Sequence, residues 1–152
     1  MQDFKIQHFK STHPNTPFPW YRSLSQLDAA SVRMKISKAL NLNSQDPDIL
    51  ISAIEEKGTL VEGEKASNSH FEIAKLLSNF GIQPRQNVLI NWSRYDDIDE
   101  IGLGDLNMYF SDIWYPGPDD IDIFDSSFRW FLSISPEGYV KVMRTTASDS
   151  AS

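Results

Sequence analysis

The sequence has no cysteine among its 152 residues, which excludes disulfide bonds, thiolate chemistry and any zinc site that needs sulfur ligands. It also has no apolar run long enough to cross a bilayer. Its first residues, MQDFKIQHFKSTHP, lack the basic stretch and apolar segment of a signal peptide. We therefore expect a cytoplasmic, bacterial protein that does not associate with membranes.

Motifs that usually carry catalysis or metal binding are absent as well. The chain has three histidines and contains neither Gly-x-Ser-x-Gly nor His-Glu-x-x-His. A calcium loop starting at Asp97 has unsuitable residues at positions 5 and 12, and one starting at Asp120 fails at positions 5 and 6. Gly102 and Gly104 are not followed by the third glycine of a phosphate-binding loop. These patterns predict no catalytic residue, no metal ligand and no cofactor.

The net charge of −7 is distributed unevenly along the chain. Residues 1–94 carry eleven Lys or Arg against nine Asp or Glu, and residues 129–152 carry three against two. Residues 95–128 carry ten acids and no Lys or Arg. These acids are Asp96, Asp97, Asp99, Glu100, Asp105, Asp112, Asp119, Asp120, Asp122 and Asp125. A stretch of one sign without counter-charges of its own is typical of a surface that meets a basic partner.

The same acidic stretch contains a turn with aromatic side chains, WYPGP, at residues 114–118. Its prolines and glycine predict a surface turn, and Trp and Tyr are enriched at interface hot spots. In the strand that follows, alternation places Asp120 and Asp122 on one face. We therefore predict one exposed partner-binding patch that consists of Trp114, Tyr115, Asp119, Asp120, Asp122 and Asp125. The alternatives are burial of the two rings under the loop and an ordinary solvated sheet face for the aspartates.

Hydrophobic periodicity predicts helices before residue 82 and strands after it. Each expected helix starts at a side chain that can cap its first turn, and two of them end at a glycine. The expected helices run from Ser23 or Ser25 to about Leu40, from Asp46 to Gly58, and from Ser69 to Gly81. The pair Ser69 and Glu72 is expected to form a capping box. Ahead of these helices, the alternation of Phe4, Ile6 and His8 predicts a strand.

The expected strands are residues 87–92 and a hairpin formed by residues 128–135 and 139–144, joined by a turn at residues 136–138. Helices followed by strands indicate an α+β fold, with an N-terminal three-helix region packed on a C-terminal antiparallel sheet. We expect one globular domain over residues 1–144 and a mobile polar tail over residues 145–152.

The preferred hypothesis for function is a small acidic, non-enzymatic binding protein that docks a basic protein partner, such as an immunity or inhibitor protein. The order of helices and strands is similar in plan to the SUKH immunity superfamily, although no motif matches residue by residue. The alternative is a carboxylate-based or divalent-metal-assisted hydrolase, since a glycosidase needs only two acids at the right separation. A regulatory or scaffold module has no distinguishing sequence feature.

Nucleic-acid binding is the least favoured hypothesis. One side of the predicted hairpin combines cations with a ring, and such a surface can bind a single strand. The residues on that side are Arg129, Phe131, Lys141 and Met143, together with Tyr139. The acidic stretch next to them would repel phosphates, so we expect no nucleic-acid partner.

Overall fold

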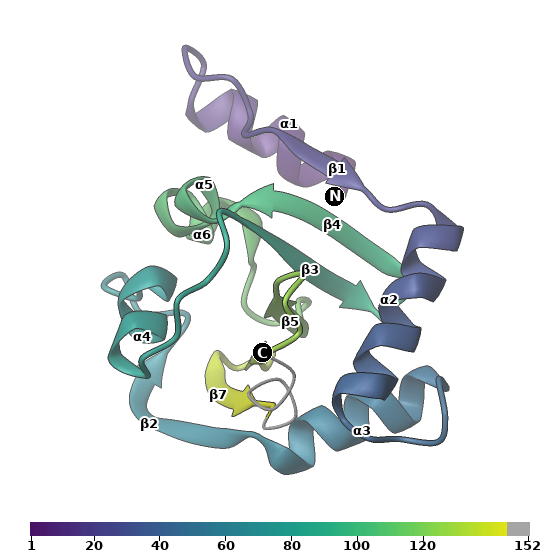
Figure 1. Ribbon diagram of the computed structural model, residues 1–152. Coiled ribbons are helices and arrows are strands. Elements are labelled where there is room, and N and C mark those ends of the chain that lie inside the picture. Colours follow the sequence, from purple (N-terminus) through teal and green to yellow (C-terminus); the bar gives the residue numbers. More distant parts are fainter. Residues whose placement is uncertain (146–152) are drawn as a thin grey trace.

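An antiparallel sheet of seven strands runs through the protein in the computed structural model, which describes residues 1–145 (Figure 1). The strands are β1 (Tyr21–Ser23), β2 (Thr59–Lys65), β3 (Asn87–Ser93), β4 (Asp97–Gly102), β5 (Ile121–Phe124), β6 (Trp130–Ile134) and β7 (Tyr139–Arg144). The helices are α1 (Asp3–Thr12), α2 (Gln26–Ala39), α3 (Pro47–Lys57), α4 (Ile73–Asn79), α5 (Leu103–Met108) and α6 (Phe110–Ile113). The predicted α+β class is therefore confirmed.

The strand order is β1-β4-β3-β5-β6-β7-β2, so the two strands from the N-terminal half form the two edges. β1 pairs with β4, and β2 pairs with β7. Neither edge strand was predicted from the sequence, because β1 has only 3 residues and the side chains of β2 are mostly exposed. The predicted C-terminal sheet is thus the centre of a larger sheet that the N-terminal half completes.

Helices cover both faces of the sheet, as the ribbon shows with α4 on one side and α2 and α3 on the other (Figure 1). One apolar cluster joins α4, α5 and α6 to inward residues of the central strands, such as Val88 and Ile90. The second cluster joins α2 and α3 to the opposite face, which includes Leu89 and Phe131. Because successive strand residues point to opposite faces, the central strands are apolar on both sides. The three predicted helices exist, but they are divided between the two faces.

The predicted N-terminal strand is wrong, because residues 3–12 form helix α1. Lys5 and Phe9, one helical turn apart, are its buried side chains, whereas Phe4 is half exposed. The ring of Phe9 meets Tyr109 with centroids 5.2 Å apart. A helix therefore forms here because two side chains at i and i+4 find partners in distant segments. The short alternation of Phe4 and Ile6 in the sequence cannot reveal these distant contacts.

The helix ends follow local chemistry where a polar side chain or glycine supplies the missing hydrogen bond. Ser25 caps α2 by accepting from Asp28 N, and Asp46 caps α3 by accepting from Asp48 N. After α4, Gly81 has φ +70° and Ile82 N donates to Leu77 O over 2.9 Å. This is the predicted left-handed ending.

The predicted capping box at Ser69 and Glu72 is wrong. Helix α4 starts at Ile73, and no side-chain hydrogen bond caps it from residue 72. Instead, the side-chain oxygen of Asn107 accepts from Ala74 N over 3.0 Å. A residue from α5 therefore satisfies an amide at the start of α4, which is a tertiary cap rather than a local one.

The predicted C-terminal hairpin is confirmed, with Gly138 in its turn at φ +93°. Phe128, at the start of the predicted strand, has φ +54° and packs in the cluster under α2 and α3, opposite to the cluster that contains Trp130, Leu132 and Ile134. Phe131 and Met143 are buried beneath α2 and α3. Hence these two side chains of the hairpin are not placed to stack on bases.

Of the tail predicted over residues 145–152, residues 146–152 lie outside the described part of the chain. Thr145 is buried, with its N–H donating to Arg129 O and its hydroxyl to Phe128 O. The limits of the single domain remain a prediction. Among residues 1–145, no helix combines the length and the apolar character needed to span a membrane.

Helix α1 is attached to the body of the protein by the fully buried Lys5. The ammonium group donates to Ile113 O over 2.8 Å and to Asp119 over 2.6 Å. It also lies 4.0 Å from the centre of the Trp92 ring. Burial lowers the pKa of Lys5, and the hydrogen bond and charge of Asp119 oppose that effect. A buried cation with so many partners joins three segments of the chain at one point.

Replacing Lys5 with Met should lower the free energy of unfolding by about 3–5 kcal/mol, because Asp119 would remain buried without its cation. Urea denaturation measures this loss. Lys10→Met is the matched control, since it makes the same change at an exposed position of α1 and should alter the stability by less than about 0.5 kcal/mol. Equal losses in the two variants would contradict a structural role for the buried pair.

Candidate functional site

The six residues of the predicted patch do not form one exposed surface. Trp114 is only 1% exposed, stacks on Phe110 and donates its indole N–H to Asp119 O. Tyr115 is partly buried and lies against Phe4 of α1, with ring centroids 5.7 Å apart. The sequence predicted a strand at the N-terminus and indicated no contact between it and this turn, whereas residues 3–12 form helix α1, which packs against the turn. The prediction of exposed contact rings is therefore wrong for Trp114.

Two aspartates of the predicted patch are buried and have internal roles. Asp119 accepts from Lys5 and from Tyr115 N, the latter over 2.7 Å. Asp125, 1% exposed, accepts from Arg85 N, Ser127 N and the indole of Trp130. Both carboxylates hold loops in place by accepting hydrogen bonds from backbone amides. Placing Asp119 and Asp125 on a docking surface is accordingly wrong.

The acidic stretch is also less isolated than its sequence indicates, because residues 1–22 supply counter-charges. The Met1 amino group pairs with Asp99, and Lys5 pairs with Asp119. Arg22 pairs with Glu100 over 3.0 Å, and His13 lies 3.2 Å from Asp112. The acids of this stretch whose side chains are exposed are Asp96, Asp97, Asp105 and Asp120. The expectation of a stretch without internal partners is wrong for about half of it.

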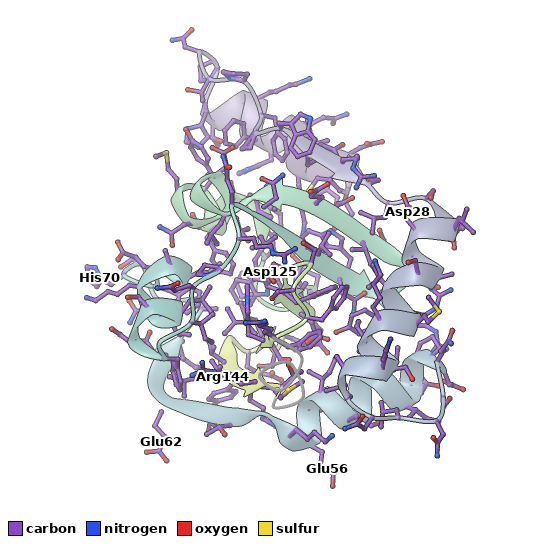
Figure 2. All side chains as sticks on the ribbon, viewed as in Figure 1. Asp28, Glu56, Glu62, His70, Asp125 and Arg144 are labelled. Carbon is purple, nitrogen blue, oxygen red and sulfur yellow. The ribbon has the colours of Figure 1, made fainter. Side chains whose placement is uncertain are left out.

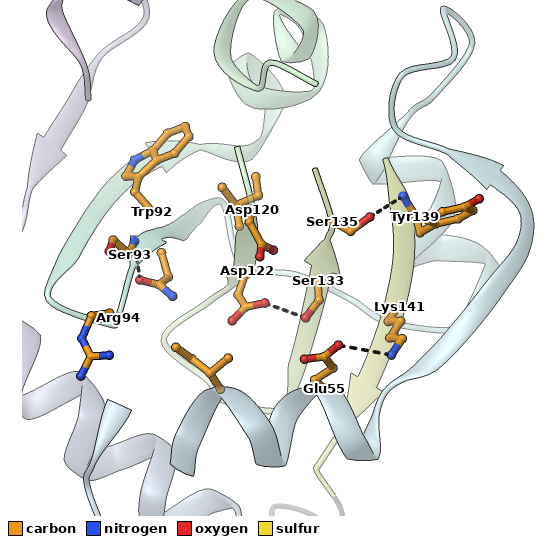
Figure 3. Close-up of a pocket in the computed structure, with 13 residues that line it drawn as sticks. Glu55, Trp92, Ser93, Arg94, Asp120, Asp122, Ser133, Ser135, Tyr139 and Lys141 are labelled. Carbon is orange, nitrogen blue, oxygen red and sulfur yellow. Dashed lines mark hydrogen bonds and ion pairs between the residues drawn. The ribbon is translucent and has the colours of Figure 1, made fainter. Parts of the chain in front are cut away.

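The remaining two residues of the patch, Asp120 and Asp122, lie together in a pocket of about 370 Å³ (Figure 3). The pocket lies on the sheet face that carries α3, and Ile51 and Glu55 of that helix border it. In the close-up, Asp120 and Asp122 lie between Trp92 and Tyr139 (Figure 3). We define this region as the acidic pocket. Its lining includes Glu55, Trp92, Arg94, Asp120, Asp122, Ser133, Tyr139 and Lys141.

The pairing register of the sheet explains why the pocket forms at this place. Side chains on one face align in transverse rows across neighbouring strands. One row is apolar and consists of Leu89, Phe124, Phe131 and Met143. The next row on the same face is polar and consists of Asn91, Asp122, Ser133 and Lys141. The core under α2 and α3 therefore ends where this polar row begins.

An unusual turn between β3 and β4 places the buried phenol of Tyr95 next to Asp122 of the acidic pocket. Arg94 and Tyr95 both have left-handed backbones, with φ +51° and +52°. The side-chain oxygen of Asn91 accepts from Ser93 N over 3.2 Å and from Tyr95 N over 2.9 Å. Arg33 donates to Tyr95 O over 2.7 Å. These bonds hold a turn that usually requires asparagine or glycine at both central positions.

Asp122 is held by hydrogen bonds to both of its oxygens. The Tyr95 hydroxyl donates to one oxygen over 2.5 Å, and the Ser133 hydroxyl donates to the other over 2.6 Å. Burial raises the pKa of Asp122, as do the charges of Asp120 and Glu55, while the two hydrogen bonds lower it. Burial and Asp122 raise the pKa of Tyr95 well above its ordinary value, so the phenol stays protonated as the donor.

Asp120 is more open to solvent and faces other carboxylates. Burial raises the pKa of Asp120, with further contributions from the charges of Glu55 and Glu137. The nearest ammonium group of the pocket, Lys141, lies 3.9 Å from Glu55. Arg94 borders the pocket but directs a guanidinium nitrogen to Asp48 over 2.7 Å. The carboxylates of the pocket are therefore only partly compensated.

This arrangement can hold a cation, or it can supply a proton from a carboxyl group. Within residues 1–145, no group of three or more His, Asp or Glu side chains is placed to hold a metal ion. Sequence reasoning missed the participation of Ser133, Tyr139 and Lys141. Their outward alternation in the hairpin was visible, but Glu55 reaches the same place from a helix far away in the sequence.

Comparison with known proteins returned no match: no family model, no curated protein and no solved structure is significantly similar to this chain.

Replacing Asp122 with Asn tests whether the buried charge of Asp122, close to Asp120 and Glu55, destabilises the folded protein. The raised pKa of Asp122 means that its contribution to stability is present below the unfolded value of about 3.8 and is lost as the pH rises through the folded value. Asp122→Asn should therefore be more stable than the original protein at pH 7, and the difference should shrink as the pH falls towards 4. Thermal unfolding across this pH range measures the effect.

Asp96→Asn is the control for this measurement, since Asp96 is an exposed acid in the neighbouring turn. It should follow the original protein at every pH. A destabilised Asp122→Asn variant at pH 7 would show that the hydrogen bonds of the carboxylate outweigh its burial and its repulsion.

Proposed function

We propose that this chain is a small, cytoplasmic, non-enzymatic binding protein that receives a basic side chain of a protein partner in the acidic pocket. One observation supports this proposal above the others. Burial raises the pKa values of Asp120 and Asp122, and the charge of Glu55 raises both further, as do Glu137 for Asp120 and Asp120 for Asp122. A cation that enters between these groups relieves their repulsion.

The electrostatic gain favours a cation that comes from outside the chain. At 4 Å, two unit charges near a protein surface attract by about 4 kcal/mol at an effective dielectric of 20. Lys141 satisfies Glu55 only at 3.9 Å, and both side chains are partly or largely exposed. Such exposed pairs contribute at most about 1 kcal/mol. An incoming ammonium or guanidinium group in the pocket therefore competes with a weak internal pair.

The rim of the acidic pocket suits a side chain that is carried by a protein. Trp92 is partly buried and Tyr139 is 50% exposed, and they lie on opposite sides of the two aspartates (Figure 3). Aromatic side chains at a rim add contact area and exclude water from a central charge pair. The nearby exposed acids Asp96 and Asp97 add to the attraction of a basic surface. An immunity or inhibitor role against a basic protein would use such a site.

A carboxylate-based hydrolase is the second candidate, because raised carboxyl pKa values also suit a general acid. The hydrogen bonds of the pocket argue against it. Both oxygens of Asp122 already accept hydroxyl protons, so this carboxylate is fixed as an acceptor. Asp120 and Glu55 are the more open carboxyl groups of the pocket, but Glu55 is paired with Lys141, and glycoside hydrolysis requires two available carboxyl groups. Binding therefore accounts for more of the geometry than hydrolysis does.

Titration with short blocked peptides tests the proposed function. A Gly-Arg-Gly peptide and a Gly-Lys-Gly peptide should shift the amide resonances of β5 and β6, whereas a Gly-Gln-Gly peptide should not. Each variant, Asp120→Asn or Glu55→Gln, should weaken binding roughly fivefold, which corresponds to about 1 kcal/mol for a partly exposed charge pair. Raising the salt concentration from 50 to 500 mM should weaken it further by screening.

Asp105→Asn is the matched control, because it removes the same charge from an exposed position of α5, outside the pocket. Equal weakening in Asp105→Asn would reduce the effect to net charge and contradict a specific site. Turnover of a glycoside or ester substrate that disappears in Asp120→Asn would favour the hydrolase instead.

A further inference from the structure

A second hollow, of about 810 Å³, has the opposite electrostatic character. It lies where the loop after α4, the loop between β5 and β6, and the end of β7 meet. Three of the six arginines of the protein line it. The arginines and serines that line it are Arg85, Ser126, Ser127, Arg129 and Arg144. We call this region the arginine hollow.

The guanidinium groups of the arginine hollow have no carboxylate partner within residues 1–145. Arg85 donates to the Ser126 hydroxyl over 2.6 Å, and Arg144 donates to Phe80 O over 2.7 Å. By contrast, Arg22 and Arg94 each form an ion pair with an acid. Because each guanidinium has five N–H donors, most donors in the hollow remain available. A protein of net charge −7 thus keeps three strong cations together, and no acid among residues 1–145 forms an ion pair with them.

The nearest buried acid, Asp125, cannot serve as that partner. One of its oxygens accepts from Arg85 N and the Trp130 indole, and the other accepts from the amide and hydroxyl of Ser127. The four lone-pair positions of the carboxylate are therefore filled. Asp125 instead fixes the two loops that carry Arg85 and Arg129. Figure 2 labels Asp125 and Arg144 in the region between α4 and α2.

From this arrangement we infer that the arginine hollow binds a phosphate group, carried by a small organic phosphate or by a phosphorylated peptide. Guanidinium groups bind oxyanions through paired N–H bonds, and three of them with the Ser126 hydroxyl offer more donors than the two oxygens of a carboxylate can use. A phosphate monoester has three terminal oxygens and up to two negative charges, which matches this donor set better. This inference is independent of the function proposed for the acidic pocket.

The exposed position of Arg129 makes it the best residue to change. The backbone carbonyl of Arg129 accepts from Thr145 N, and a substitution keeps that bond. The Arg129 side chain forms no hydrogen bond with residues 1–145, so replacing this side chain should leave the loops intact. Arg144→Gln would test the opposite side of the hollow but also removes the bond to Phe80 O. Arg22→Gln is the matched control, because it removes the same charge outside the hollow.

Calorimetric titration with three probes tests the inference: inorganic phosphate, pyrophosphate and a phosphoserine peptide, each at constant ionic strength. At least one probe should bind, and Arg129→Gln should weaken that binding about tenfold while Arg22→Gln leaves it within twofold. Unchanged melting temperatures of both variants would show that the loss reflects the site. Tighter binding of the peptide would assign a phosphoprotein as the source, and tighter binding of pyrophosphate a free phosphate compound.

Three outcomes would overturn the inference. The first is no binding of any probe at millimolar concentration. The second is an equal loss in Arg129→Gln and Arg22→Gln, which would indicate attraction by net charge alone. The third is equal binding of the phosphoserine peptide and of the same peptide with glutamate at the phosphoserine position. That result would indicate that the hollow binds carboxylates as well as phosphates.

Discussion

The need to bury both faces of one sheet governs this structure. Central strands such as β3 present apolar side chains alternately to α4–α6 and to α2–α3, so neither helical layer can be lost without exposing a core. Removing apolar surface from water contributes roughly 25 cal/mol per Å², which makes these two interfaces the main stabilising contacts. Both candidate sites lie where this coverage stops. The acidic pocket begins at the polar row beyond the α3 interface, and the arginine hollow lies among loops at an end of the sheet.

Charged residues in this protein have two distinct uses that their sequence positions do not separate. Asp119, Asp122 and Asp125 belong to one acidic segment, yet each meets a different set of donors. Asp119 and Asp125 anchor loops, whereas Asp122 supports the floor of a pocket. A carboxylate whose lone pairs are all occupied is a structural group, and one that faces other carboxylates is available to a ligand. Local hydrogen bonding therefore decides which acids belong to a site, and acid density does not.

The sequence predicted the features that depend on neighbouring residues. The helices capped by Ser25 and Asp46, the glycine ending at Gly81 and the C-terminal hairpin all depend on side chains within a few residues of one another. Prediction failed where a distant partner decides the outcome. Helix α1 forms around Lys5 and Phe9, whose partners include Asp119 and Tyr109, and the edge strand β2 pairs with the distant strand β7. For the same reason, Asp120 and Asp122 were predicted as site residues, but Glu55, which completes the pocket from α3, was not.

Two contacts between distant segments restrict when this chain can fold during its synthesis. Strand β2 pairs with β7, and Lys5 pairs with Asp119, which is 114 residues further along the chain. Until Asp119 has been synthesised, Lys5 lacks this counter-ion, and until β7 has been synthesised, β2 lacks its neighbour in the sheet. The N-terminal half therefore leaves the exit tunnel with unfinished surfaces and completes its tertiary structure only after β7 has emerged. During that interval, we expect apolar side chains of the N-terminal half to be exposed on the nascent chain, where chaperones that recognise such segments can bind them.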